Sequence, residues 1–336
     1  MMSRYAAVHV NPQGLGDGRP TAMQIVKDES MEGKLAGKTV VITGISSGIG
    51  IGTVLALSAT GAHLLLTARD LTKAKRALGD IFDPNTMDLI EMDQSSLNSV
   101  RTATEIILSK TDQVTILVTN AAIMAVQDLQ LAESGHELQF TTNHLSHFLL
   151  FNLLKSALLA GSSPDFQSRV VVVAAAAHRV VQLPPSDNYH FQKGGYRPWG
   201  AYGQSKLGNI YMANEIERRY GSHGLHAIRL HPGLIATGLA QNLPKEEIGA
   251  MMQNEAMLKL QKRLEQGAAT TLWAAVSKEL EGKGGLYLSD CAVAAHGEDD
   301  GIPFFGTTSS STYNIEDEAR LWEDSLKMVG LSGDEY

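Results

Sequence analysis

Residues 39–50, TVVITGISSGIG, join a short apolar run to a turn that contains three glycines. The run Thr39–Thr43 is short and rich in β-branched residues, which predicts a buried strand, and the stretch Ile49–Ala59 predicts a helix. Glycines allow a tight turn and close approach of the backbone to a ligand, and a helix N-terminus presents free N–H groups to an anion. The stretch therefore predicts a pyrophosphate-binding turn. The residues expected to line it are Gly44, Ser46, Ser47, Gly48, Ile49 and Gly50.

Short apolar runs and helix-length segments alternate along the rest of the chain. The runs expected to form strands are Thr39–Thr43, Leu64–Thr67, Leu89–Met92, Thr115–Val118, Val170–Val173 and Ala227–Leu230. The segments expected to form helices between them are Ile49–Ala59, Leu71–Leu78, Leu97–Leu108, Phe140–Ala160 and Ala201–Arg219. This alternation is typical of a parallel sheet covered by helices on both faces. We therefore predict an α/β protein with a doubly wound parallel sheet, the Rossmann fold.

The elements divide the chain into three parts of one domain. Residues 1–37 precede the first strand and predict an N-terminal arm, either packed over the body or frayed. Residues 38–240 predict the dinucleotide-binding and catalytic core. Residues 241–336 predict a small helical substrate cover, rich in flexible methionines, and a C-terminal part packed on the same domain. That part is expected to contain a last strand at Gly282–Leu288, a tail from Gly301 and a short helix around Leu321–Met328.

Composition excludes several classes of function. The chain has 336 residues and a formal net charge of −8, which argues against a nucleic-acid or anionic-membrane partner. The one cysteine, Cys291, cannot form an internal disulfide, and no stretch approaches the roughly 18 apolar residues of a membrane span. We therefore predict a cytoplasmic enzyme that acts on a small molecule.

The end of the second strand indicates which dinucleotide is bound. An NAD site places a carboxylate there for the ribose 2′-OH, whereas a 2′-phosphate requires a cation. Here Ala68 stands at the usual acidic position, and Arg69 follows with a planar fork suited to phosphate. The neighbouring Asp70 is expected to cap the helix from Leu71. The sequence therefore favours NADP(H).

These residues resemble the short-chain dehydrogenase/reductase family, and the match continues over nearly the whole chain. The turn Thr43–Gly50 resembles the family's TGxxxGIG element, the stretch Thr119–Ala122 resembles its NNAG with two departures, and AYGQSK contains its YxxxK. The resemblance implies that Tyr202, Lys206 and Asn143 are catalytic. It also implies cofactor contacts at Asp93, Asn120, Ala121, Tyr202, Lys206, Pro232, Gly233 and Thr237.

Three further stretches carry a closer similarity. GDGRPTA at residues 16–22, EQGAATTLWAA at Glu265–Ala275 and GLYLSDC at Gly285–Cys291 are similar to the retinol-dehydrogenase-like branch, especially to its fungal relatives in lipophilic or secondary metabolism. The resemblance also implies that the two long helices, Phe140–Ala160 and Ala201–Arg219, pair across a homodimer axis.

Tyr202 and Lys206 stand four residues apart and therefore share one face of a helix. A phenol with a pKa of about 10 is a poor proton donor and acceptor near neutral pH. A lysine ammonium and the charge of an oxidised nicotinamide favour the phenolate, so we expect them to bring the pKa of Tyr202 towards working pH.

One position departs from the family. Aligning RVVVVAAAAH, residues 169–178, with the family's RVVNVSSxAH places Ala175 where the catalytic serine belongs. That serine donates to the substrate oxygen, a role comparable to an oxyanion-hole donor worth about 10² to 10³ in rate. Three explanations stay open. The alanine is an engineered substitution, or it is natural and another hydroxyl compensates, such as that of Ser205 or one within Leu183–Tyr196. In the third explanation, the alanine indicates non-redox chemistry.

Several other residues are expected to be structural. His144 and His147 lie three apart on a helix, but no third ligand with suitable spacing follows, so we predict packed histidines and no metal. His178 is expected to be packed or hydrogen-bonded. Trp199, Trp273 and Trp322 are expected to be packing residues.

The predicted function is an NADP(H)-dependent oxidoreductase, a carbonyl reductase or alcohol dehydrogenase acting on a lipophilic small molecule. Two alternatives stay open. One is a non-redox isomerase or cyclase on the same scaffold, and the other is a protein that binds NADP(H) without turnover.

Overall fold

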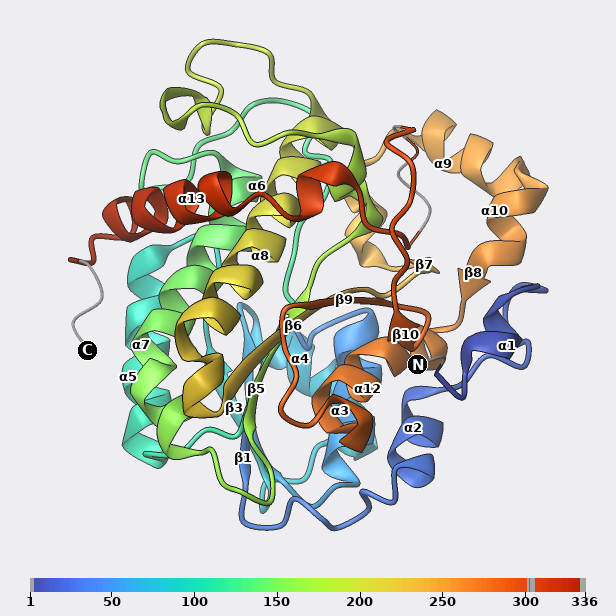
Figure 1. Cartoon of the computed structure of the whole chain (residues 1–336), viewed down its shortest axis with the longest axis vertical. Coiled ribbons are helices and arrows are strands. Elements are labelled where there is room, and N and C mark those ends of the chain that lie inside the picture. Colours follow the sequence, from blue (N-terminus) through green and yellow to red (C-terminus); the bar gives the residue numbers. More distant parts are fainter. Residues whose placement is uncertain (1–2, 301, 303–305, 333–336) are drawn as a thin grey trace.

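The computed structural model describes residues 3–300, 302 and 306–332, and Figure 1 shows the chain. Its central sheet has the strand order β10-β9-β6-β5-β4-β1-β2-β3. The strands are β1 (Thr39–Thr43), β2 (His63–Ala68), β3 (Met87–Glu91), β4 (Ile116–Thr119), β5 (Ser168–Val173), β6 (Leu225–His231), β9 (Leu286–Ser289) and β10 (Ala292–Val293). From β3 to β9 all neighbouring strands run parallel, whereas β10 is antiparallel to β9. The predicted doubly wound α/β fold is confirmed, with one antiparallel edge strand added.

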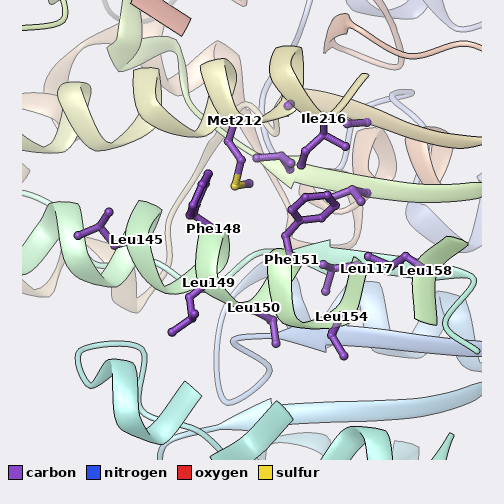
Figure 2. Packing of buried hydrophobic residues seen from close by; sticks show 14 of the residues in the cluster. Leu117, Leu145, Phe148, Leu149, Leu150, Phe151, Leu154, Leu158, Met212 and Ile216 are labelled. Carbon is purple, nitrogen blue, oxygen red and sulfur yellow. The ribbon is translucent and has the colours of Figure 1, made fainter. Parts of the chain in front are cut away.

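Helices cover both faces of the sheet (Figure 1). One face carries α5 (Leu97–Lys110), α7 (Ser146–Ala160) and α8 (Pro198–Tyr220). The other face carries α2 (Ala22–Asp28), α3 (Ile49–Ser58), α4 (Leu71–Leu78), α11 (Leu264–Gly267) and α12 (Ala269–Val276). Figure 2 shows the apolar side chains of α7 packed between Leu117 of β4 and the residues Met212 and Ile216 of α8. Each face thus has its own buried apolar cluster, which is why the sheet strands are apolar on both sides.

The predicted runs agree with the strands to within two residues at each end, except for the last one. The segment Gly282–Leu288 was predicted as a strand, but β9 begins only at Leu286. Gly282 and Gly285 both have a φ of +65°, so the chain turns there before it can enter the sheet.

The predicted helix Phe140–Ala160 is interrupted at its start. A short helix α6 (Leu138–Phe140) leads into a π-helical turn, Thr141–Leu145, and α7 begins only at Ser146. The carbonyl of Asn143 accepts a hydrogen bond from His147 Nδ1 at 2.9 Å, so a side chain takes part in the bonding of this turn. Single π turns within helices occur frequently at functional sites.

The N-terminal part packs on the body. It contains α1 (Ala6–His9) and α2, and α2 buries Ile25 and Val26 completely against the α12 side of the molecule. Thr21 caps α2, because its side chain accepts from Gln24 N at 3.2 Å.

The segment for which we predicted a substrate cover forms α9 (Lys245–Gln253) and α10 (Glu255–Leu260), followed by a strand pair that the sequence did not predict. In this pair β7 (Leu234–Ile235) runs parallel to β8 (Gln261–Lys262). Strands of two residues carry no periodic pattern, so only the tertiary structure reveals them.

The C-terminal helix α13 (Ile315–Met328) begins six residues before the predicted start, because Asn314 caps it through Asp317 N at 3.2 Å. Gly301, where we predicted the tail to begin, lies outside the described residues. Trp322 of α13 packs edge-on against Phe148 and Phe151 of α7. Helix α13 therefore packs against α7 and α8, the two helices that we expect to pair across a homodimer axis. Within the described ranges, no helix is long and apolar enough to cross a membrane.

Candidate active site

The glycine turn after β1 is shaped by close backbone contacts. A Cβ on Gly44 would lie 2.6 Å from Ala121 Cα, and one on Gly50 would lie 2.3 Å from the Gly44 carbonyl oxygen, so neither position admits a side chain. Gly48 has φ +64° and ψ −151°, a conformation open essentially only to glycine. It stands at the N-cap of α3 without any side-chain cap, so the first amides of this helix are left for another acceptor.

The turn after β4 is bound to the glycine turn. Asn120 Nδ2 donates to the carbonyls of Thr43 and Gly44, each at 2.9 Å. The Thr43 hydroxyl accepts from the backbone N–H groups of Asn120 and Ala121 at 2.9 and 3.0 Å. The two departures from NNAG therefore do not prevent hydrogen bonds between this turn and the glycine turn. The Asn120 side chain bonds to the backbone of the glycine turn.

His147 completes this network, and its role was not predicted. Its Nδ1 donates to the Asn143 carbonyl, so the neutral ring can accept only at Nε2, which lies 2.9 Å from both Thr43 Oγ1 and Gln94 Nε2. Burial lowers the pKa of His147 to about 4, which keeps this tautomer neutral. The ring thus joins the glycine turn to the π-helical turn that carries Asn143, a contact between segments that sequence spacing cannot show.

The cradle fits the phosphates of a dinucleotide. It combines the uncapped N-terminus of α3 with glycines that allow a tight turn and close backbone packing. The hydroxyls of Ser46 and Ser47 make no hydrogen bond within the described chain. Thr237 lies across the turn, 3.4 Å from the place of a Gly48 Cβ, and its own hydroxyl accepts from Leu239 N at 3.2 Å.

The residues expected around the adenosine lie beyond the ends of β2 and β3. Arg69 is exposed and has no polar partner among the described residues. Asp70 caps α4 by accepting from Lys73 N at 2.8 Å, as predicted. Asp93 Oδ1 accepts from the amide and hydroxyl of Ser95 at 2.9 and 2.7 Å, which fixes the turn after β3.

Tyr202 and Lys206 lie side by side in α8 and are almost fully buried, at 4% and 2% exposed. Lys206 Nζ lies 5.7 Å from the centroid of the Tyr202 ring and donates to the Val173 carbonyl at 2.9 Å. Burial raises the pKa of Tyr202 and lowers the pKa of Lys206 to about 7. In the chain alone, burial raises the tyrosine pKa because loss of hydration penalises the phenolate, whereas the lowering that we expect includes the charge of a bound oxidised nicotinamide.

Asn143 joins α8 to the loop after β4. Its Oδ1 accepts from Ile123 N and its Nδ2 donates to Ile123 O, both at 2.9 Å. The same Nδ2 also donates to Ser205 Oγ at 2.9 Å. The Asn143 side chain is thus fixed by hydrogen bonds to Ile123 in the loop after β4 and to Ser205 in α8.

Ala175 lies between β5 and a short 3-10 helix, half-buried and with an extended backbone. The hydroxyls offered by the sequence as replacements are engaged elsewhere. Ser205 Oγ donates to the Tyr202 carbonyl at 2.7 Å. Within Leu183–Tyr196, the hydroxyls of Ser186 and Tyr189 both donate to the Asp324 carboxylate. The Tyr196 hydroxyl donates to the Val126 carbonyl. None of these candidates is free to orient a substrate in place of the serine.

The remaining histidines and tryptophans have structural partners. His144 Nε2 lies 3.0 Å from Ser325 Oγ, and His178 Nδ1 lies 2.8 Å from the Ala175 carbonyl. Trp273 and Trp322 are buried, whereas Trp199 is only half-buried. In the described part of the chain, no group of three or more His, Cys, Asp or Glu side chains could hold a metal ion.

Buried histidines make the fold sensitive to acid. Burial lowers the pKa of His144 and His231 to about 3 and of His147, His178 and His190 to about 4. Between about pH 6.5 and pH 5 the unfolded chain binds protons that these native side chains do not, so the free energy of unfolding falls as the pH falls. Burial raises the pKa of Glu137 to about 7, so this carboxyl alone would make the free energy of unfolding rise as the pH falls. It is a single group, whereas the five histidines act together.

Urea titrations at several pH values between 7.5 and 5 measure this slope. A positive slope of unfolding free energy against pH is expected, corresponding to net proton uptake on unfolding. A flat or negative slope would contradict the buried neutral state of these histidines.

Comparisons with known proteins agree with this architecture. The family model described as short chain dehydrogenase matches residues 38–248. The chain is 44% identical over 329 residues to the short-chain dehydrogenase/reductase prx1 of Penicillium roqueforti, covering 98% of this chain and 96% of the relative. It is 41% identical to the oxidoreductase calI of Penicillium decumbens, covering 99% of each chain.

Solved structures have the same fold. A protein of uncharacterized function from Mycobacterium paratuberculosis matches with a TM-score of 0.67 at 27% identity, covering 94% of this chain and 100% of that one. An NADP complex of Pseudomonas aeruginosa RhlG matches with a TM-score of 0.61 at 20% identity, covering 77% and 96%. The retinol-dehydrogenase-like branch stays a prediction. From its family model and its relatives, the chain belongs to the short-chain dehydrogenases.

Proposed function

We propose that this oxidoreductase uses NADP(H) to reduce a carbonyl group on a lipophilic small molecule or to run the reverse oxidation. The observation that carries the proposal is the buried pair Tyr202 and Lys206, in a chain that also has a glycine turn at the uncapped N-terminus of α3. A bound nicotinamide would supply or accept the hydride. The chain's own residues would orient the substrate oxygen and move its proton.

The proton would come from Tyr202. Because burial raises the pKa of this phenol, it is protonated near neutral pH, which is the form that donates to a carbonyl oxygen during reduction. Lys206, held by the Val173 carbonyl, would contact the nicotinamide ribose and tune the phenol. Asn143 would support the proton relay from its fixed position next to Ser205. These roles for Lys206 and Asn143 are those that the family resemblance implies.

A lipophilic substrate is supported by the surroundings of Tyr202. The Trp199 ring packs edge-on at 6.0 Å from the Tyr202 ring, and Trp199 Nε1 donates to Glu247 of α9 at 2.7 Å. No side chain of α9 is buried, and Ile248 and Met252 are 37% and 54% exposed. This helix therefore offers unused apolar surface, tied to the catalytic helix, that a lipophilic ligand could cover. Similarity to Penicillium relatives supports a place in secondary metabolism.

The proposal is tested by following the loss of NADPH absorbance with a panel of lipophilic ketones and aldehydes. Consumption of NADPH matched by formation of the alcohol supports it. Product formation without nicotinamide oxidation would show an isomerase or cyclase instead. Tight NADPH binding without any product would show a binding protein, and the missing serine at Ala175 is the observation that favours these two alternatives.

The preference for NADP(H) over NAD(H) rests on Arg69. Its guanidinium is exposed at the end of β2, and Ala68 leaves no carboxylate at the position that would repel a 2′-phosphate. We expect Arg69→Ala to weaken NADPH binding by about tenfold or more, the worth of one charge-assisted contact, and to leave NADH binding nearly unchanged. Fluorescence titration with both nucleotides measures this. Equal losses for the two would contradict it, and Arg76→Ala, on the following helix, is the matched control.

A further inference from the structure

Lys262, the last residue of β8, is a buried lysine whose contacts converge on the turn after β6. It is 3% exposed, and its Nζ donates to the Pro232 carbonyl at 3.2 Å and to Asp290 Oδ1 at 2.6 Å. Gly233 has a φ of +104°, and a Cβ there would lie 2.8 Å from Lys262 Cε, so the lysine side chain packs directly on this glycine. The turn His231–Leu234 is thus held from one side by a single cation.

The carboxylate that neutralises Lys262 comes from a strained turn. Asp290 and Cys291 join β9 to β10, and both have positive φ values, +54° and +52°. Hairpin turns with two left-handed residues ordinarily use Asn-Gly or Asp-Gly, so a cysteine at the second position is unfavourable. Cys291 N donates to Thr270 Oγ1 at 3.2 Å, which helps to fix this conformation. The strain places the Asp290 carboxylate against Lys262.

The N-terminal arm holds the other end of β8. Arg19 is 5% exposed and donates to the carbonyls of Leu260 and Gln261 at 3.0 and 2.5 Å. Gln266 Nε2 in turn donates to the Arg19 carbonyl at 3.0 Å. Because β8 pairs with β7, which begins directly after Gly233, the arm restrains the strand that carries Lys262. The three stretches of closer family similarity, around residues 16–22, 265–275 and 285–291, therefore meet beside one turn.

The family resemblance implies that the stretch from Pro232 to Thr237 closes over the nicotinamide. We propose that Lys262, with Asp290 as its counter-ion, is a positioning residue that holds the Pro232–Gly233 turn in the shape that receives this half of the cofactor. This inference rests on the proposed function. A buried ammonium needs anionic or carbonyl partners, and here they are Asp290 and the carbonyl that sets the entry to Gly233. A side chain without a charged donor would remove the bond to the Pro232 carbonyl and release the turn, whereas the Asp290 carboxylate, 44% exposed, can be hydrated.

The test compares two ligands in the variant Lys262→Met. Its affinity for NADPH should fall about tenfold or more, whereas adenosine 2′,5′-bisphosphate, which lacks the nicotinamide half, should bind as it does to the wild type. Deuterium exchange of the cofactor-free protein should be faster at residues 233–235. Lys259→Met, an exposed lysine three residues earlier, is the matched control and should change neither quantity.

The two readouts distinguish a positioning role of Lys262 from a general structural role. Equal weakening of both ligands would show a general structural role and overturn the proposal, as would unchanged exchange and unchanged NADPH binding. If Lys262→Met does not fold, Asp290→Asn, which keeps the size of the counter-ion but removes its charge, is judged by the same two readouts. If the wild type binds neither ligand, the proposed function fails, and the exchange experiment alone still tests the positioning role.

Discussion

Placing a hydroxyl at position 175 should raise turnover by about 10² to 10³, the worth of one donor aimed at a substrate oxygen. The Ala175→Ser variant requires no change of backbone, because φ −160° and ψ 157° are extended values open to serine. The position lies two residues after the end of β5, at the start of a 3-10 helix, and is half-buried. The hydroxyls of Ser205, Ser186, Tyr189 and Tyr196 are engaged elsewhere, so we expect none of them to supply the missing donor already.

Steady-state rates of NADPH consumption measure this gain in the variant and in the parent chain. Ala175→Cys is the control, since cysteine has nearly the size of serine but only a weak donor. A gain in the serine variant that the cysteine variant lacks identifies the hydroxyl as the cause. Equal rates in all three proteins would contradict a reductase that lacks only its serine, and would favour a different reaction on the same scaffold.

A slow parent enzyme is consistent with the rest of the site. Tyr202, Lys206 and Asn143 are buried and each has a defined position, so the loss of one partner need not abolish activity. If the alanine is natural, we expect compensation from the substrate itself or from α9, which is bonded through Glu247 to Trp199, the neighbour of the Tyr202 ring.

The fold could be predicted because its signals are local. Apolar runs such as Thr39–Thr43 and Val170–Val173 are strands in the structure, and Asp70 caps α4 as its side-chain chemistry predicts. Errors arose where tertiary contacts override local pattern. The start of α7 was misplaced because a π-helical turn precedes it, and β7 with β8 was missed because each has only two residues.

The site was predictable only in part, for the same reason. Spacing along one helix brings Tyr202 and Lys206 together, and the pattern of a strand and a glycine turn identifies the cradle. Contacts between distant segments, such as His147 with Thr43, have no signature in a single sequence. The rise in the pKa of Tyr202 in the cofactor-free chain has no signature there either, because burial cannot be read from the spacing of two residues.

Replacing Tyr202 by phenylalanine should lower turnover by about 10² to 10⁴, the range of a positioned general acid. Phenylalanine keeps the ring that packs on Trp199 and under Lys206 and removes only the hydroxyl, so the fold and the affinity for NADPH should change little. Rates of NADPH consumption and a fluorescence titration separate the two effects.

Tyr211→Phe is the matched control for this variant. It lies in the same helix, is equally buried and donates to the Ser311 carbonyl at 2.7 Å, away from the catalytic pair. Its variant should lose some stability, by about 1 kcal/mol for one hydrogen bond, but keep its rate. Turnover that survives in Tyr202→Phe would contradict a proton from this phenol. Within the described residues the Tyr202 hydroxyl makes no hydrogen bond, so removing it breaks no bond that holds the fold, and a large loss of turnover with unchanged NADPH affinity would be chemical.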